Sequence, residues 1–457
     1  MRMSLGLTFG AILLGMTGCR TSSTPSGIPA PGRPEGSKWE IGKPIVWYKQ
    51  GPGAGGVPSM WNGPARPELH VTEPGEEPPR FEFISPAAAK KLADGGFNVM
   101  FVRNLNDLDW AHANGMRGLL YVHEGEPPWR NVFDVDGLDD PEWVAKLNSL
   151  IDSVKDHPAM YGYISYDEPG TPKFPELARI VAHVRKRDPK HMVFINLFPT
   201  YASPGAQGTS GDKVTAYREY LRRFIDEVKP DLLSYDHYHF FANSDRSDGY
   251  FLNLSLVREA ALKNGLPFIN VVQAASMGQW HRAPNGDEGR FLAYTTLAYD
   301  GQGICQFVYN SWEGAEHWGG IENPDRSLTH LGKAAREFQP KFVAIGEQLQ
   351  PLTSLGVYHH GAVPAGGIGL PVDAPISVET DSDMLLGYFG TAGVTSHVLV
   401  VNLDYTQNVT TTVVGPGSME VFDATERKWH KASDGSRARV SLMPGGGKLL
   451  RLAGVQE

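Results

Sequence analysis

The chain has 457 residues, of which 41% are hydrophobic, which is enough to bury a large core and to form two domains. Charged residues make up 20% of the sequence, and the formal net charge is -9. No basic tract accompanies this mildly acidic balance. Nucleic-acid binding requires a concentrated positive surface, so we do not expect it, and a neutral ligand fits the composition better.

The N-terminal 18 residues have the pattern of an export signal. A basic start at Arg2 precedes an apolar run over residues 5–16, and small residues stand directly before Cys19. The Met-Thr-Gly-Cys ending resembles a bacterial lipobox, which implies cleavage before Cys19 and lipid attachment to its thiol. We therefore expect a protein anchored in the bacterial cell envelope, with a plain signal peptide and an incidental Cys19 as the alternative.

Two further features bear on the membrane and on redox chemistry. Residues 19–38 are rich in Ser, Thr, Pro and Gly and predict a flexible tether. No other stretch is long and apolar enough to span a bilayer, so we expect membrane contact through the N-terminal lipid only. Cys305 lies within an apolar run and predicts a buried thiol, without a disulfide framework.

Residues 39–352 alternate between short apolar runs and helical patterns. The expected strands are residues 44–48, 97–102, 118–122, 160–166, 191–197, 231–235, 267–272 and 303–309. The expected helices are residues 86–94, 107–114, 141–155, 175–186, 214–228, 252–264, 289–299 and 328–349. Eight strands each followed by a helix predict a (β/α)8 TIM barrel. A doubly wound open sheet is the competitor, but its GxGxxG loop is missing after the first strand.

Residues 353–457 have a different sequence pattern, which predicts a C-terminal antiparallel β-sandwich. Short alternating runs are separated by turn residues, as is typical of such sandwiches. The expected strands are residues 376–379, 384–389, 396–402, 409–414, 418–422, 438–442 and 447–452. This region carries no convergent set of chemical groups, so we expect it to pack against the barrel, with sugar binding as the alternative.

Acidic and polar side chains gather at the ends of the expected barrel strands. The clearest case is the buried strand within residues 160–170, which stops at Asp167-Glu168-Pro169-Gly170. Active sites of such barrels collect at these strand ends. The other strand ends carry Arg103, His123, Glu124, Asn196, Asp236, His237, Tyr238, His239, Gln273, Trp312 and Glu313.

Two of these strand ends resemble a known group of enzymes. The Tyr-Asp-Glu-Pro end of the fourth strand and the Tyr-Asn-Ser-Trp-Glu end of the eighth are similar to clan A glycoside hydrolases, including bacterial β-galactosidase-like and cellulase-like enzymes. The likeness extends over about residues 45–452. It implies hydrolysis of O-glycosidic bonds, with Glu168 as the acid/base. It also implies that Asp167 stands where the clan usually has an Asn that contacts the sugar 2-hydroxyl.

The sequence departs from this clan at the seventh strand, where the nucleophilic Glu is replaced by Gln273. Glycosidic hydrolysis needs two carboxyl groups, so another residue must supply the second one. We expect Asp236 to do so, with Glu313 as second choice and Glu124 as third. The competing interpretation of Asp236 is a buried carboxylate that holds neighbouring His or Tyr side chains.

The remaining strand-end residues are predicted to bind the carbohydrate. They are Asp167, Asn196, His237, Tyr238, Gln273, Trp312, His123, Glu124 and Arg103. Aromatic residues that can stack on sugar rings are Tyr48, Trp61, Trp110, Tyr238, Trp280 and Trp312, of which Trp312 is favoured.

We expect no cofactor, but two alternatives to the hydrolase remain open. One is a metal-dependent hydrolase or sugar isomerase with ligands among His123, Asp167, Glu168, Asp236, His237 and His239. The other is a surface lipoprotein that binds glycans without cleaving them, which the missing strand-seven carboxylate favours.

Overall fold

The computed structural model of the chain describes residues 45–49, 85–121, 123–124, 130–131, 133, 137–242, 249–278, 280–309, 319–323 and 325–453. The predicted export signal, the tether and Cys19 lie outside these residues, as do Trp312 and Glu313. Among the described helices, none is both long enough and apolar enough to cross a membrane.

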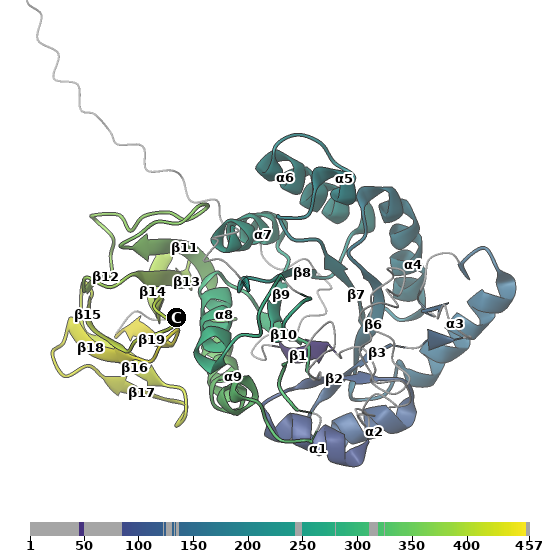
Figure 1. The fold of residues 1–457 in the computed structure, drawn as a ribbon, viewed down its shortest axis with the longest axis horizontal. Coiled ribbons are helices and arrows are strands. Elements are labelled where there is room, and N and C mark those ends of the chain that lie inside the picture. Colours follow the sequence, from purple (N-terminus) through teal and green to yellow (C-terminus); the bar gives the residue numbers. More distant parts are fainter. Residues whose placement is uncertain are drawn as a thin grey trace, which may run out of the picture.

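Eight parallel strands form one curved sheet at the centre of the larger domain (Figure 1). Their spatial order is β1-β10-β9-β8-β7-β6-β3-β2. The strands are β1 (Ile45–Lys49), β2 (Val99–Val102), β3 (Arg117–Leu120), β6 (Met160–Asp167), β7 (Met192–Leu197), β8 (Leu233–His237), β9 (Phe268–Gln273) and β10 (Gly303–Phe307).

The two ends of this sheet meet beside Asn98, just before β2. The Val46 backbone N–H donates to Asn98 Oδ1 at 2.8 Å, and the Asn98 N–H donates to the Val46 carbonyl at 3.1 Å. These bonds bring β1 against the start of β2 and nearly close the barrel. The predicted TIM barrel is therefore confirmed, and the open doubly wound sheet is wrong.

Each barrel strand is followed by a helix on the outside of the sheet. The helices are α1 (Pro86–Asp94), α2 (Leu105–Ala113), α3 (Pro141–Val154), α4 (Phe174–Arg187), α6 (Lys213–Arg223), α7 (Tyr250–Asn264), α8 (Gly286–Ala298) and α9 (His330–Leu349). Their starts are set by local sequence: Asp140 caps α3, and Asn285 with Glu288 forms a capping box on α8.

Several boundaries differ from the expected ones, and short elements appear between the main ones. The helix expected over residues 214–228 changes into a π-helix at η4 (Phe224–Val228), which ends at Lys229 with φ +55°. The eighth strand stops at Phe307, two residues early. The additional elements are the antiparallel pair β4 (His123–Glu124) and β5 (Arg130–Asn131), the 3-10 turn η3 (Thr171–Lys173) and the short helix α5 (Pro204–Gln207).

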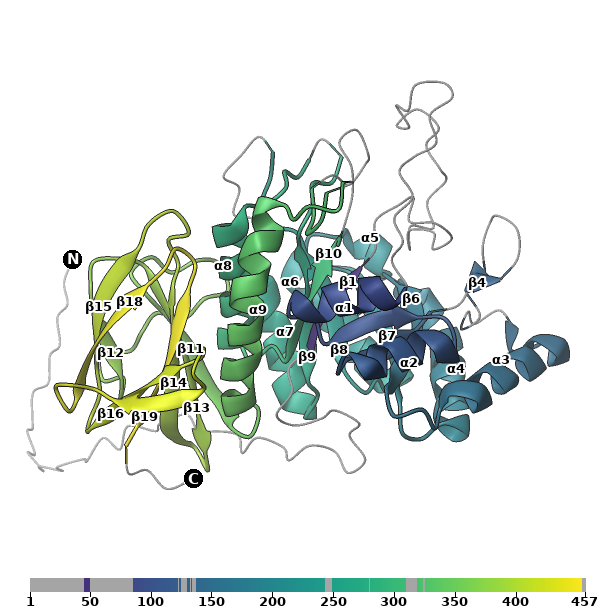
Figure 2. The same ribbon diagram turned by 90° about the horizontal axis from the view of Figure 1, so that it is seen from below.

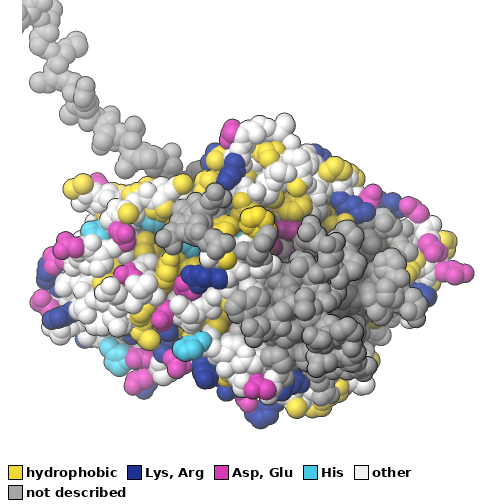
Figure 3. Space-filling model, in the orientation of Figure 1, with side chains coloured by type: hydrophobic (Ala, Val, Ile, Leu, Met, Phe, Trp, Pro, Cys, Tyr) yellow, Lys and Arg dark blue, Asp and Glu magenta, His cyan; other side chains and the backbone are white. Residues whose placement is uncertain are grey.

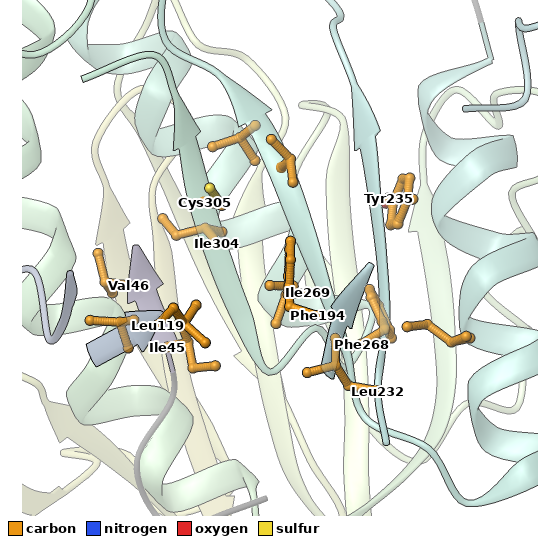
Figure 4. Close-up of a cluster of buried hydrophobic side chains, with 14 of the residues drawn as sticks. Ile45, Val46, Leu119, Phe194, Leu232, Tyr235, Phe268, Ile269, Ile304 and Cys305 are labelled. Carbon is orange, nitrogen blue, oxygen red and sulfur yellow. The ribbon is translucent and has the colours of Figure 1, made fainter. Parts of the chain in front are cut away.

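Large apolar side chains from neighbouring strands form a buried cluster in the larger domain (Figure 4). Those labelled in the figure include Phe194, Phe268 and Ile304, each of which is at most 1% exposed. Cys305 is fully buried in the same cluster, as predicted. Burying such side chains stabilises a fold by roughly 1.5–3 kcal/mol each.

The smaller domain consists of two antiparallel sheets that pack face to face, which confirms the predicted β-sandwich (Figure 2). The six-stranded sheet contains, in order, β11 (Thr353–His360), β13 (Met384–Thr391), β14 (Val394–Asn402), β19 (Gly447–Leu452), β16 (Met419–Asp423) and β17 (Lys428–Lys431). The three-stranded sheet contains β12 (Ser377–Glu379), β15 (Val409–Val414) and β18 (Arg437–Leu442).

The six-stranded sheet contributes to two cores, one on each face. Along β13, Met384 and Leu386 face the three-stranded sheet, whereas Leu385 and Phe389 join the large cluster shared with the barrel. This division follows from the two-residue period of a strand. Helix α8 lies between the two domains, and every residue of it except Asp287 is buried (Figure 1).

Close contact between α8 and the sheet depends on Gly387. A Cβ at this position would stand 2.5 Å from the Ala298 carbonyl oxygen, at the end of α8. The side of the sheet that faces the barrel also carries two buried histidines, His359 on β11 and His397 on β14. Burial lowers the pKa of both imidazoles to about 4.

These two histidines predict a pH-dependent stability. In an unfolded chain an imidazole titrates near pH 6.5, so between about pH 6.5 and 4 the unfolded state binds protons that the folded state does not. Stability should therefore fall as the pH falls through this window, by up to about 1.4 kcal/mol per pH unit for each histidine, and this loss should level off below about pH 4.

Urea unfolding at several pH values between 7 and 4 measures this effect. The double variant His359→Gln, His397→Gln should show a flatter pH dependence, even if its stability at pH 7 is lower. Replacing the exposed His330 by Gln is the matched control and should leave the slope unchanged. An unaltered slope in the double variant would show that other groups cause the acid sensitivity.

Candidate active site

Asn196, at the end of β7, joins three neighbouring strand ends of the barrel. Its side-chain Nδ2 donates to Asp167 Oδ1 on β6 at 3.0 Å, and its Oδ1 accepts from Ser234 Oγ on β8 at 3.0 Å. Its backbone carbonyl accepts from the Glu168 N–H at 2.8 Å. Because Asn196 is fully buried, these bonds fix the orientation of Asp167 and the backbone at Glu168.

Glu168 has an uncommon backbone conformation, with φ +49°. The left-handed region costs a residue with a side chain roughly 1–2 kcal/mol. In a regular strand, Asp167 and Glu168 would point to opposite faces. The left-handed residue ends that alternation, which allows both carboxylates to face the same site.

Asp236 projects from β8 toward the barrel interior. Its neighbours Tyr235 and His237 face the surrounding helices: Tyr235 interacts with Tyr250 of α7, and His237 Nδ1 lies 2.9 Å from Asn253 Oδ1 of the same helix. Asp236 therefore points inward, like Ser234 two residues before it. It is 5% exposed.

The negative charges of all three carboxylates act on the phenol of Tyr238. Burial raises the pKa of this phenol, and the negative charges of Asp236, Asp167 and Glu168 raise it further. Burial likewise raises the pKa of Tyr220 of α6, and the charges of Glu168 and Asp236 add to that effect. Tyr220 also donates to the Pro169 carbonyl at 2.7 Å, which supports the turn after Glu168.

His237 and Tyr238 lie at the same strand end, but both are buried. The ring of Tyr201 packs edge-on against His237 at 5.0 Å, and the Tyr201 hydroxyl accepts from the Tyr238 N–H at 3.4 Å. Tyr238 itself packs against Phe307 of β10, with ring centroids 5.3 Å apart. The substrate contacts predicted for Asn196, His237 and Tyr238 remain predictions.

Gln273, at the strand end where the resemblance implies the clan nucleophile, is fully buried and bonded to backbone groups. Its Oε1 accepts from the Phe240 N–H at 2.8 Å. Its Nε2 donates to the carbonyls of Phe240 at 3.2 Å, Ala275 at 3.4 Å and Arg282 at 2.7 Å. The side chain thus connects the segment after β8 with the segment after β9. Its predicted contact with substrate stays a prediction.

The other predicted residues are placed less completely. Arg103 follows β2 and pairs with Asp107 of α2, its Nε lying 2.9 Å from Asp107 Oδ2. His123 and Glu124 form β4, but their side chains lie outside the described part of the structure. Trp312 and Glu313 lie outside it altogether, so their roles also remain predictions.

Two of the histidines proposed as metal ligands, His237 and His239, have their side chains in the described part of the structure. His237 and His239 do lie on the same side, since both rings pack against Tyr250 at 5.5 and 4.9 Å. Within the described ranges, no three His, Cys, Asp or Glu side chains stand close enough together to hold a metal ion.

Sequence reasoning missed three polar residues that support the site. Ser234 could have been found, because it stands two residues before Asp236 on one face of the strand. Tyr220 and Asn253 come from helices, and nothing in their local sequence marks them. Asn253 contacts His237, donates to the Tyr217 hydroxyl at 3.0 Å and accepts from the Thr200 N–H at 2.8 Å.

The structure is similar to those of glycoside hydrolases. A cold-adapted β-galactosidase from Rahnella sp. R3 matches with a TM-score of 0.50 and 9% identity, over 90% of this chain and 98% of that one. A catalytic mutant of a family 42 β-galactosidase from G. stearothermophilus matches with a TM-score of 0.54 and 8% identity, over 91% and 99%. No protein-family model and no curated protein matches the sequence. At the level of the fold, the resemblance to clan A (β/α)8 glycoside hydrolases is confirmed.

The bonds of Gln273 yield a stability prediction for the variant Gln273→Glu. A carboxylate accepts hydrogen bonds but donates none, so it would face three carbonyl oxygens from a buried position. We expect a loss of about 2–4 kcal/mol in the free energy of unfolding, measured by urea denaturation. Gln407→Glu, in an exposed turn, is the control and should change stability by about 0.5 kcal/mol or less. Equal stability of the two variants would contradict a stabilising role for the hydrogen bonds of the Gln273 side chain.

Proposed function

We propose that this protein is a glycoside hydrolase that cleaves O-glycosidic bonds of an oligo- or polysaccharide with two carboxyl groups. The observation that carries the proposal is the hydrogen bonding of Asn196, which holds Asp167 and the Glu168 backbone at the end of β6 and reaches Ser234 on β8, the strand from which Asp236 points inward. Carboxylates brought together at the C-terminal ends of barrel strands meet the chemical requirement of glycosidic hydrolysis. The β-galactosidases with a similar fold add support, although the fold alone does not fix the reaction.

In this scheme Glu168 protonates the departing glycosidic oxygen. Asp236 either attacks the anomeric carbon or activates the water that does so. Asp167, held by Asn196, accepts hydrogen bonds from sugar hydroxyls. Glu313 is the second choice for the role of Asp236.

The strand arrangement is compatible with either stereochemical outcome. Glu168 follows β6 and Asp236 belongs to β8, with only β7 between them. Two inter-strand spacings amount to roughly 10 Å. Side chains that lean toward each other from such positions can bring the carboxyl groups to about 5–5.5 Å for retention or about 6.5–9.5 Å for inversion.

The acid role of Glu168 predicts a dependence on the leaving group. Glu168→Gln should lower kcat/KM by roughly 10²–10⁴-fold on natural disaccharides and alkyl glycosides, whose leaving oxygen must be protonated. Dinitrophenolate leaves a dinitrophenyl glycoside without being protonated. The same variant should therefore show a much smaller loss of kcat/KM on dinitrophenyl glycosides. Asp236→Asn should lower both rates, because its role does not depend on the leaving group.

Initial rates on the two substrate series, with and without EDTA, measure these differences. Glu259→Gln is the control, since Glu259 is exposed on α7 and pairs with Arg218. Equal losses on both series in Glu168→Gln would remove Glu168 from the acid role. A loss of activity in EDTA, restored by a divalent cation, would favour the metal-dependent alternative.

One observation favours a second candidate, a glycan-binding protein without activity. The position of the clan nucleophile holds Gln273, which is committed to backbone contacts. A pure binder should take up oligosaccharides measurably and release no reducing ends or aryl alcohol in long incubations. The unaltered protein in the rate assay above distinguishes the two candidates.

We also propose that the protein is exported and anchored to the bacterial envelope through Cys19. The support is the sequence itself: a basic start, an apolar run and the Met-Thr-Gly-Cys ending. Cys19→Ser should abolish labelling of the expressed protein by a radioactive fatty acid and should move it from the membrane fraction to the soluble fraction. Unchanged fractionation and labelling would contradict the anchor.

A further inference from the structure

Trp280 stands apart from the other large aromatic side chains at the ends of the strands. Among the described residues, two large aromatic side chains are exposed, Tyr201 at 37% and Trp280 at 69%. Tyr201 has an evident role, because its ring packs on His237 and its hydroxyl bonds to the Tyr238 backbone. Trp280 lies between β9 and α8, on the side of the barrel where the strands end.

The backbone around Trp280 is held from two sides. The Trp280 N–H donates to the Met277 carbonyl at 3.2 Å, within a tight turn that the Met277 N–H closes on the His281 carbonyl at 3.0 Å. From the segment after β8, the Ala242 N–H donates to the Trp280 carbonyl at 2.8 Å. A single exposed apolar side chain is ordinary. Here, however, the fold fixes the backbone and still leaves the indole ring in water.

A row of aromatic contacts leads from the carboxylates to this position. Tyr238 follows Asp236 by two residues, and its ring lies 6.2 Å from the His281 ring. His281 packs in turn on Phe241 at 4.5 Å. Trp280 directly precedes His281 in the chain, with the two Cα atoms about 3.8 Å apart. The backbone of Trp280 is therefore connected, through His281 and Tyr238, to the strand end that carries Asp236.

Two other aromatic residues that were candidates for stacking on a sugar are less exposed than Trp280. Trp110 is partly buried against the barrel core. Tyr238 is 9% exposed, and its ring is covered by Phe307. Trp280 is therefore the most exposed of these three rings.

We propose that Trp280 is a stacking platform for a sugar unit beyond the one at the carboxylates. A pyranose ring presents a face of C–H groups that matches the flat, electron-rich face of an indole. On the coloured part of the face in Figure 3, basic and acidic side chains are interspersed, and no single charge dominates there. The ligand class is thus a neutral oligosaccharide of at least two units, and the inference rests on the proposed glycosidase function.

Binding to neutral oligosaccharides tests this directly. In a Glu168→Gln background, which prevents turnover, calorimetry is run with β-1,4-linked glucose, galactose and mannose oligomers of two to five units. Trp280→Ala should weaken binding of the oligomers that the parent binds by about tenfold or more. Trp280→Phe should restore most of the affinity, but the ligand-induced change in tryptophan fluorescence should be smaller than in the parent. Val372→Ala, at an exposed position of the sandwich, is the control and should bind like the parent.

Two results would overturn the inference. One is equal affinity of the Trp280→Ala and Val372→Ala variants. The other is hydrolysis of aryl glycosides by the unaltered protein together with no binding of these oligomers by the Glu168→Gln variant. In that case the hydrolase proposal stands and the Trp280 proposal fails. If the protein neither cleaves any glycoside nor binds any oligomer, both proposals fail together.

Discussion

The hydrogen bonds of Asn196 are the constraint on which the candidate site depends. One buried side chain and its own carbonyl hold Asp167, Glu168 and Ser234, and so link the ends of β6, β7 and β8. Removing such a partner leaves buried polar groups unsatisfied, at about 1–3 kcal/mol each. The same bonds hold the left-handed backbone of Glu168, a conformation that occurs where surrounding structure enforces it and often marks functional sites.

The β-sandwich contributes to the site through packing. Its six-stranded sheet shares one core with the barrel across α8, which has almost no exposed residue. Tyr405 of the sandwich packs edge-on against Phe240 at 5.6 Å and against Phe291 of α8 at 5.3 Å. Phe240 is also the residue whose backbone Gln273 binds on both sides. The segment that follows Asp236 is therefore fixed from the barrel and from the sandwich together.

Much of the fold could be predicted from the sequence, because alternating apolar runs and helix signals determine a barrel strand by strand. All seven expected sandwich strands are present, whereas β11 and β17 were missed: Gly356 interrupts the first, and Lys428 and Lys431 bound an exposed second strand. In the site, the strand-end positions of Glu168 and Asp236 follow from the sequence. The left-handed turn at Glu168 and the backbone partners of Gln273 do not, since they depend on residues distant in the chain.

The central claim is that Glu168 and Asp236 act on one bond in one site, and a double-mutant cycle on kcat/KM tests it most directly. Groups that act as a unit lose their effects non-additively. The protein carrying Glu168→Gln and Asp236→Asn together should therefore be about as impaired, on a glycoside whose leaving group needs protonation, as the worse of the two single variants. Losses that multiply in the double variant would mean that the two carboxylates act independently, and would contradict the shared site.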